Sequence, residues 1–262
     1  MPRAARRPPR RFPDGPVWVR TYPVTYLHDR TEPAHAHAWH QLSYALTGHM
    51  EIETAHARRL VPRDRAVWVP AGTEHGETMR APVSVRSLYF ATGALPGRFD
   101  AGRCRTLEVS PLLRELILHV TRIGALDRRV PEQARLIGVL VDLLARARDV
   151  ELELRTPRDP RARRFAALVA DRPDDPRSIA ELARAAGASV RTLERCFVAE
   201  TGLAVGEWRR RHRLFHALGL LERGATVSEA AFGVGYDSLS AFSAAFRRQF
   251  GAPPTRRRRA GT

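Results

Sequence analysis

The sequence predicts an α+β chain of two domains, in which a β-barrel of the jelly-roll kind precedes an all-α C-terminal domain. From about residue 17 to residue 99, short segments rich in Val, Tyr and Trp alternate with Gly and Pro, as in consecutive strands. After Leu107, apolar residues recur at helical spacing. The 262 residues suffice for two domains of moderate size.

Positive charge is concentrated toward the C-terminus and in the first residues. The net charge is +16, and residues 158–262 hold 20 arginines against 11 acidic residues, while residues 21–157 hold 18 against 16. Binding to phosphates would require such a distribution. No apolar run approaches the roughly 18 residues of a membrane span, and the N-terminus lacks the apolar core of a secretory signal. We therefore expect a cytoplasmic protein that does not contact membranes.

The first 106 residues are expected to hold a tail and the barrel. Residues 1–15, rich in Arg and Pro, predict a disordered basic arm, and residues 16–106 predict the barrel. The expected strands are Val17–Tyr22, Gln41–Leu46, His49–Thr54, Ala66–Val69 and Val83–Phe90.

Seven of the ten histidines lie between His28 and His75. One spaced motif in this segment consists of His35, His37, Gln41 and Gly48. A second motif, PxGxxH, consists of Pro70, Gly72 and His75. The two motifs resemble those of cupin barrels, with Gln41 at the position where cupins carry glutamate.

The cupin resemblance makes His35, His37, Gln41 and His75 the candidate site of the barrel. Strand residues at i and i+2 share a face, so His35 and His37 would point inward together. With His75 they would offer three imidazoles, a set that suits Zn, Fe, Ni or Cu, and Gln41 would be a weaker, neutral fourth ligand. Two alternatives stay open: a divalent metal, or a metal-free polar pocket for a small organic effector. No cofactor is certain.

Residues 107–150 predict two amphipathic helices, Ser110–Gly124 and Pro131–Val150, with Leu and Ile stripes. Ser110 and Pro111 have the pattern of an N-cap followed by proline in the first turn. Residues 151–160, which contain Pro157 and Pro160, predict an interdomain linker.

Residues 161–262 contain two helix-turn-helix patterns joined by a helical segment, Val205–Glu222. In the first, Ser178 and Glu181 have capping-box spacing and Gly187 marks the turn. The expected buried face of its second helix is Val190, Leu193 and Phe197. The expected DNA-facing residues are Arg191, Thr192, Glu194 and Arg195.

The second pattern repeats this plan. Thr226 and Glu229 form another capping box, and Gly233 and Gly235 mark the turn. The inward residues of its second helix, which starts at Asp237 or Ser238, are Phe242, Phe246 and Phe250. Its expected DNA-facing residues are Leu239, Ser240, Ser243 and Ala244, with Arg247 and Arg248 behind them.

The motifs AELA, SVRTLERCFVAETG and AFGVGYDSLSAFSAAFRRQFGAPP carry a second resemblance. They make residues 161–259 similar to the DNA-binding domain of the AraC/XylS family of transcription regulators, whose sensor half is usually a cupin barrel. In that family each unit places a recognition helix in one of two adjacent major-groove segments. The second recognition helix here is poor in long polar side chains, so we expect weaker base readout from it.

The two resemblances together imply a ligand-responsive regulator that binds double-stranded promoter DNA. Arg191 and Arg195 are the candidates for base or phosphate contacts, and Glu194 for accepting from a cytosine amine. Phosphate contacts are assigned to Arg209–Arg211 and Arg256–Arg259. Further expected partners are a small-molecule effector, RNA polymerase if the protein is an activator, and a second copy joined through residues 107–150.

Two other classes of function are compatible with parts of the sequence. One is a metal-dependent cupin enzyme with an attached helical domain, which Gln41 in place of glutamate disfavours. The other is a nonspecific, nucleoid-type DNA binder, which would enrich no sequence motif.

Overall fold

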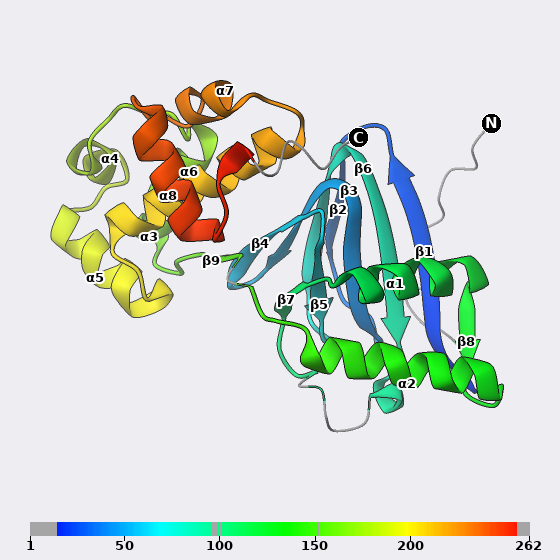
Figure 1. Ribbon diagram of the computed structural model, residues 1–262. Helices are drawn as coiled ribbons and strands as arrows, with labels where there is room; N and C mark the ends of the chain where they lie inside the picture. Colours follow the sequence, from blue (N-terminus) through cyan, green and yellow to red (C-terminus); the bar gives the residue numbers. More distant parts are fainter. Residues whose placement is uncertain (1–14, 96–98, 100, 151, 256–262) are drawn as a thin grey trace. The chain divides into compact units, whose positions relative to one another are not determined.

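A computed structural model describes residues 15–95, 99, 101–150 and 152–255 of the chain (Figure 1). It divides into two compact units. The first contains Met1–Thr54 and Arg59–Leu152, and the second contains Ala55–Arg58 and Glu153–Thr262. Nearly all of the expected basic arm and all of Arg256–Arg259 lie outside the described residues. Among the described residues, no helix combines the length and apolar composition that crossing a membrane requires.

The first unit is built on one antiparallel sheet. Its main strand order is β7-β5-β3-β6-β1-β8, while β2 pairs with β6 and β4 pairs with β3. The strands are β1 (Val17–Tyr26), β2 (Arg30–His35), β3 (His40–Thr54), β4 (Ala57–Pro62), β5 (Arg65–Val69), β6 (His75–Phe90), β7 (Arg105–Glu108) and β8 (Ala125–Asp127). A further short strand, β9 (Glu153–Arg155), belongs to the second unit. A 3₁₀ turn, η1 (Thr92–Ala94), follows β6.

Alternation along β3 directs two kinds of side chain to the two faces of the sheet. Leu42 and Tyr44 join a buried apolar cluster with Trp68 and Phe90. Helices α1 (Pro111–Ile123) and α2 (Pro131–Arg146) complete this cluster, and they lie side by side across that face (Figure 1). Fully burying each large apolar side chain contributes about 1.5–3 kcal/mol, which fixes the register of β3. Gln41 and Ser43, the intervening residues, are buried on the opposite face.

The two expected strands Gln41–Leu46 and His49–Thr54 form the single strand β3, which contains Gly48. The register against β6 shifts between Ala45 and Thr47 and again between Thr47 and His49, as at a β-bulge. Gly48 has φ +68°, and a Cβ atom there would lie 2.4 Å from the carbonyl oxygen of Pro82. A glycine is therefore required by close backbone approach and not by a turn.

Other differences concern short strands. The expected strands matched β1, β3, β5 and β6, but β2, β4, β7, β8 and β9 were not predicted. Several of these carry charged residues that break the apolar alternation on which the prediction depended. One of them, β8, falls between the two helices of residues 107–150, and β9 falls in the segment expected to be a linker.

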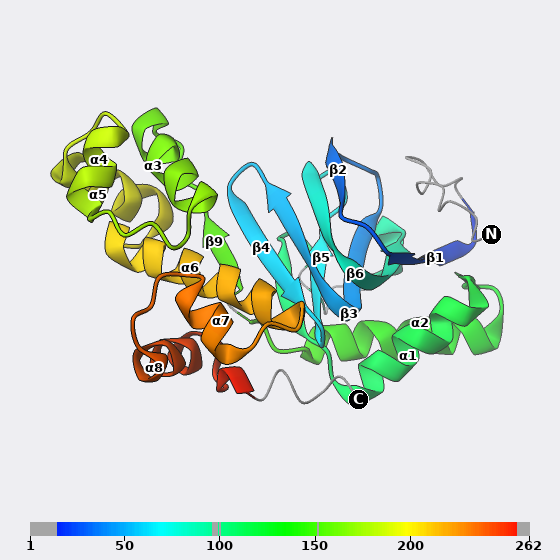
Figure 2. The ribbon, with the colours of Figure 1, turned by 90° about the horizontal axis from the view of Figure 1, so that it is seen from above.

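The second unit contains six helices among the described residues. They are α3 (Pro160–Asp171), α4 (Ile179–Ala185), α5 (Val190–Thr201), α6 (Val205–Glu222), α7 (Val227–Phe232) and α8 (Leu239–Phe250). Helix α6 contacts α3 and α5 as well as α7 and α8, and it lies between these groups in both ribbon views (Figure 2). Phe197, Phe165 and Trp208 pack together on one side of the unit. Phe242 and Phe246 are fully buried on the other.

Candidate nucleic-acid interface and histidine site

Helices α4 and α5 form the first helix pair, and local contacts define both of them. The Ser178 hydroxyl accepts from the Glu181 amide at 3.2 Å, and the Glu181 carboxylate accepts from the Ser178 amide at 2.8 Å. This reciprocal capping box was predicted and is confirmed. The turn contains Gly187 at φ +73°, and Ser189 caps α5 by accepting from the Thr192 amide at 3.1 Å. The hydroxyl of Thr192 lies 2.9 Å from that of Ser189, so Thr192 takes part in the cap.

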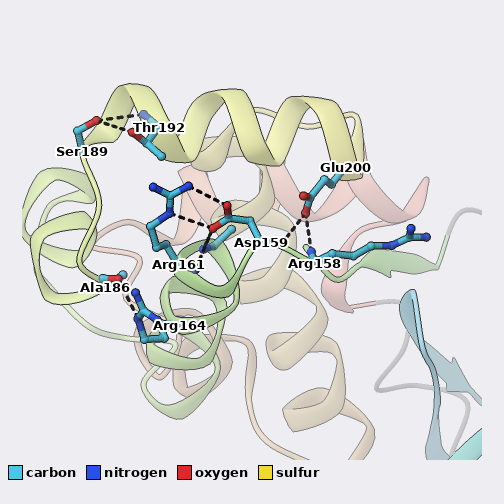
Figure 3. Close-up of polar contacts among 9 residues, drawn as sticks. Arg158, Asp159, Arg161, Arg164, Ala186, Ser189, Thr192 and Glu200 are labelled. Carbon is cyan, nitrogen blue, oxygen red and sulfur yellow. Dashed lines mark hydrogen bonds and ion pairs between the residues drawn. The ribbon is translucent and has the colours of Figure 1, made fainter.

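Helix α3 anchors the first helix pair (Figure 3). Arg164 of α3 donates from Nε to the carbonyl oxygen of Ala186, in the turn between α4 and α5, at 3.0 Å. Glu200, in the last turn of α5, accepts from the backbone amides of Arg158 and Asp159. These contacts hold α5 near both of its ends, which presents its outer face as a rigid surface.

Asp159 caps α3 and so supports that anchor. Its carboxylate accepts from the amides of Arg161 and Ala162 and pairs with the Arg161 guanidinium at 2.9 Å (Figure 3). The hydrogen bond from Arg161 is the main reason that the pKa of Asp159 lies well below its usual range.

Two arginines stand on the exposed face of α5. Arg191 and Arg195 are both exposed, and residues at i and i+4 share one face of a helix. Within the described part of the chain, neither guanidinium has a hydrogen bond or an ion pair. Leu193 and Phe197, on the opposite face, are fully buried, as predicted. Val190, which was expected to be buried with them, is 38% exposed, because it occupies the first position of the helix beside the turn.

Glu194 does not face outward as predicted. Its Oε2 accepts from the backbone amide of Val205, the first residue of α6, at 3.1 Å. The N-cap residue of α6 is Ala204, which has no side-chain acceptor for the unpaired amides of the first turn. Glu194, which is half-buried, therefore serves through Oε2 as a cap supplied by another helix.

We expect Glu194→Ala to lower the free energy of unfolding by about 0.5–2 kcal/mol, the usual effect of losing a helix cap. Urea denaturation followed by circular dichroism measures this change. Arg195→Ala is the matched control, because Arg195 is a neighbour on α5 without a polar contact to the described residues. Equal stability of Glu194→Ala and the unmodified protein would contradict the capping role.

Arg209 was expected to contact DNA phosphates, and in the structure it is half-buried and binds backbone carbonyls of its own unit. Its guanidinium donates to the carbonyl oxygens of Arg177 at 2.8 Å and Asp175 at 2.5 Å, and burial lowers its pKa. Arg213 donates to the carbonyl of Asp175 as well, at 2.9 Å. These arginines satisfy backbone acceptors of the irregular segment before α4, so Arg209 stabilises the fold. Its neighbours Arg210 and Arg211 pair with Glu207.

Helices α7 and α8 form the second helix pair with the same local devices. Thr226 and Glu229 form the predicted capping box, Gly235 has φ +75°, and Ser238 accepts from the Ala241 amide. The exposed residues of α8 are Leu239, Ser240, Ala241, Ala244, Arg247 and Arg248, while Ser243 is half-buried. Arg247 and Arg248 are the long polar side chains among them, so α8 offers few groups for reading bases.

The structure brings His35, His37 and His75 together. His35 ends β2 and lies opposite His75, which begins β6, while His37 follows β2 in non-strand backbone. The prediction that His35 and His37 lie in one strand is therefore wrong. The candidate ligand atoms of His35, His37 and His75 nevertheless lie within 4.8 Å of one another. Their imidazole centroids are 4.6 Å (His35–His75) and 5.2 Å (His37–His75) apart.

All three histidines use Nδ1 in the same way. The Nδ1 atoms of His35, His37 and His75 lie 2.9, 2.6 and 3.0 Å from the backbone carbonyls of Pro33, Trp39 and Thr73. A carbonyl only accepts, so each Nδ1 carries the hydrogen and each neutral ring keeps its lone pair on Nε2. Histidines that bind metals are oriented in this way.

His75 has an unpartnered nitrogen. Its Nε2 is buried and makes no hydrogen bond with any described residue. Burial lowers its pKa to about 4, so the ring is neutral at neutral pH. An unpaired buried acceptor is costly, and a bound cation or ligand donor would remove that cost.

Gln41 of β3 contacts one of the three histidines, His37. Its Oε1 lies 2.7 Å from Nε2 of His37, and its Nε2 donates to the Ser43 hydroxyl at 2.7 Å and to the Glu77 carboxylate at 2.8 Å. Glu77 is not among the site residues predicted from the sequence, although it stands two residues after His75 on β6 and so shares its face. That spacing was the signal that could have found it.

Comparison with known proteins gives consistent matches. Residues 182–260 match the family model described as a helix-turn-helix domain. The HTH-type transcriptional regulator NimR of Escherichia coli (strain K12) is 34% identical over 226 residues, which cover 86% of this chain and 82% of that protein. The HTH-type transcriptional regulator RipA of Corynebacterium glutamicum is 37% identical over 99 residues, 38% of this chain and 30% of that protein.

Solved structures give low overall similarity. ToxT from Vibrio cholerae with bound unsaturated fatty acid is 12% identical and covers 94% of this chain and 96% of its own, at a TM-score of 0.39. The DNA-binding domain of AdpA in complex with a target DNA is 34% identical and covers 39% of this chain and 93% of its own, at a TM-score of 0.37. Family membership therefore rests on the sequence matches. The extent of the match to NimR shows that the chain belongs to the AraC/XylS family of HTH-type transcriptional regulators.

Proposed function

We propose that the protein is a sequence-specific regulator that reads promoter DNA through α5 and α8. The observation that carries the proposal is the pair of exposed arginines, Arg191 and Arg195, on a helix that α3 anchors near both ends. In this proposal each helix pair is one helix-turn-helix unit, and each second helix enters the major groove. Selection of bound duplexes from a random pool tests the proposal, because a nucleoid-type binder would enrich no motif.

The two helices are proposed to contribute unequally. Arginine is the most frequent reader of guanine, through two parallel hydrogen bonds, so Arg191 and Arg195 would specify sequence. On α8, Arg247 and Arg248 would mainly contact phosphates and position the protein. Leu239, Ser240, Ser243 and Ala244 would supply short-range contacts to base edges, such as apolar contact with a thymine methyl group.

The sheet unit is proposed to be a cupin-like jelly-roll sensor that binds an effector at the histidine site. The residues present fit a divalent cation: three imidazoles converge, each Nδ1 is fixed by a carbonyl, and Nε2 of His75 is otherwise unpartnered. His35, His37 and His75 would hold the cation with Gln41 Oε1. A bound cation would supply a positive charge and open coordination positions for an effector. The second candidate is a metal-free pocket in which the same nitrogens accept from an organic effector.

We expect His75→Ala to abolish cobalt or zinc binding while leaving DNA affinity in the absence of metal nearly unchanged. Loss of one of three imidazoles removes a ligand outright, whereas the helix pairs keep their caps and cores. Equilibrium dialysis and a gel-shift titration measure the two quantities. His28→Ala is the control, because His28 is exposed and outside the cluster. Turnover of a substrate that vanishes in His75→Ala would favour the enzyme alternative instead.

Helices α1 and α2 are proposed to join two copies of the chain. Leu112 on α1 and Val139 on α2 are 61% and 45% exposed, more than expected for helices whose apolar stripes only cover the sheet. Sedimentation of the purified protein tests this proposal, and a monomer at all concentrations would contradict it. Contact with RNA polymerase would follow only if the regulator activates transcription.

A further inference from the structure

A carboxylate lies directly behind Gln41, one hydrogen bond away from the histidine site. Glu77 of β6 accepts from Nε2 of Gln41 at 2.8 Å. Gln41 itself is 1% exposed, so its amide has no access to bulk water. The cupin resemblance assigns no role to the position of Glu77.

Glu77 determines which way the amide of Gln41 points. An ionised carboxylate only accepts hydrogen bonds, so the amide must turn its NH₂ group toward Glu77. The other amide hydrogen goes to the Ser43 hydroxyl at 2.7 Å, and that hydroxyl lies 3.1 Å from Ser87 Oγ. Both hydrogens of the amide are therefore used, and Gln41 presents only the lone pairs of Oε1 to the histidines.

His37 consequently stands between two acceptors. Its Nδ1 lies 2.6 Å from the carbonyl of Trp39, and its Nε2 lies 2.7 Å from Oε1 of Gln41. A neutral imidazole has one N–H and can satisfy only one of these contacts. The second contact requires a positive species, which is either a second proton on the ring or a cation bound by both atoms.

We propose that Glu77 is a positioning residue that makes Gln41 a metal ligand and supplies the negative charge that a glutamate ligand would supply directly. The inference rests on the proposed divalent cation at the histidine site. Three neutral imidazoles and a neutral amide leave both charges of the cation uncompensated. A carboxylate one hydrogen bond away polarises the amide, which makes Oε1 a stronger donor of electron density to the cation. Its charge also favours a cation over an anion at the site.

The experiment is a titration of the full, chelator-treated chain with Co²⁺, followed by its visible absorption, with Zn²⁺ competition. Outer partners of metal ligands typically contribute about 10–100-fold to metal affinity, so we expect Glu77→Gln to weaken Co²⁺ binding by that factor. Glu74→Gln is the matched control: it removes one carboxylate close to His75 in the sequence, but Glu74 is exposed and makes no hydrogen bond to Gln41. We expect its affinity to equal that of the unmodified protein.

The double variant Gln41→Glu/Glu77→Gln separates positioning from a purely structural role. It exchanges the two groups, so the new amide can donate to the new carboxylate, which then faces the histidines directly. We expect affinity at least equal to that of the unmodified protein and a changed Co²⁺ absorption spectrum, because an anionic oxygen replaces a neutral one. If Glu77→Gln does not fold, this variant decides the question alone, and affinity 10-fold or more below that of the unmodified protein would overturn the proposal.

Two further outcomes would overturn the inference, and they differ in what else fails. Unchanged Co²⁺ affinity in Glu77→Gln would remove the role of Glu77 and leave the cation site standing. Failure of the unmodified protein to bind Co²⁺ or Zn²⁺ would contradict both the cation site and the role of Glu77. The proposed DNA readout would be unaffected.

Discussion

Replacing Arg191 or Arg195 by alanine is expected to erase one half of the recognised DNA sequence and to leave the other half intact. The unmodified protein should enrich a motif of two blocks roughly one helical turn, about 10 base pairs, apart. In the variants, the block read by α5 should lose its sequence preference. The block read by α8 should persist, because α8 has its own caps and buried phenylalanines.

The size of the effect distinguishes base contacts from phosphate contacts. Loss of a two-hydrogen-bond contact from arginine to guanine should cost about 1–3 kcal/mol, or ~5- to 150-fold in affinity for the preferred site. Loss of a phosphate contact should weaken binding to all sequences alike and reduce the salt slope by about 1. Gel-shift titrations at several salt concentrations, on the preferred and a scrambled duplex, measure both.

Arg223→Ala is the matched control for these variants. It removes the same charge from an exposed position at the end of α6, outside either second helix. Its motif should contain both blocks. An unchanged two-block motif in Arg191→Ala and Arg195→Ala would show that α5 does not read bases, and no motif from the unmodified protein would favour nonspecific binding.

Phe197→Ala is expected to destabilise the helical unit by about 3–5 kcal/mol, the usual effect of truncating a buried phenylalanine. Phe197 is fully buried, and its ring centroid lies 5.6 Å from that of Phe165 and 5.3 Å from that of Trp208. One side chain therefore joins α3, α5 and α6. Domains have a total stability of about 5–15 kcal/mol, so this loss is a large fraction of it.

Urea denaturation followed by circular dichroism measures the loss, and DNA binding should fall with it near the new midpoint. Val198→Ala is the control, because Val198 is the next residue on α5 and is 54% exposed. Exposed substitutions usually change stability by no more than about 0.5 kcal/mol. A Phe197→Ala midpoint equal to that of Val198→Ala would mean that α5 is held mainly by its polar anchors to α3.

The sequence was most informative where partners lie close along the chain. Both capping boxes join residues three positions apart, and the turn glycines act through their own backbone, so residue type and spacing predicted them. The cap supplied by Glu194 was not predicted, because its partner, the Val205 amide, lies 11 residues away beyond a turn. The backbone contacts of Arg209 were not predicted either, because its acceptors belong to an irregular segment more than 30 residues earlier.

The histidine site shows the same limit. Motif spacing selected the three histidines and Gln41, and the structure places them together even though His37 is not in a strand. Glu77 was missed because its contact with Gln41 spans 36 residues and two strands of the sheet. In the register of β3 against β6, Gln41 lies opposite Tyr89 and Glu77 lies opposite Ile52. Strand pairing therefore does not place the two side chains side by side, and no local pattern predicts their contact.

Each helix pair is closed by contacts of its own: in the described part of the chain, Ser178, Glu181 and Ser189 cap the first, and Thr226, Glu229 and Ser238 cap the second. The caps of one pair therefore do not depend on those of the other. After duplication of the gene, a descendant has a stepwise route to a new operator. If both pairs read DNA as proposed, one half-site can diverge while the other keeps the protein on its DNA, so that no ancestor along the route has to survive without binding.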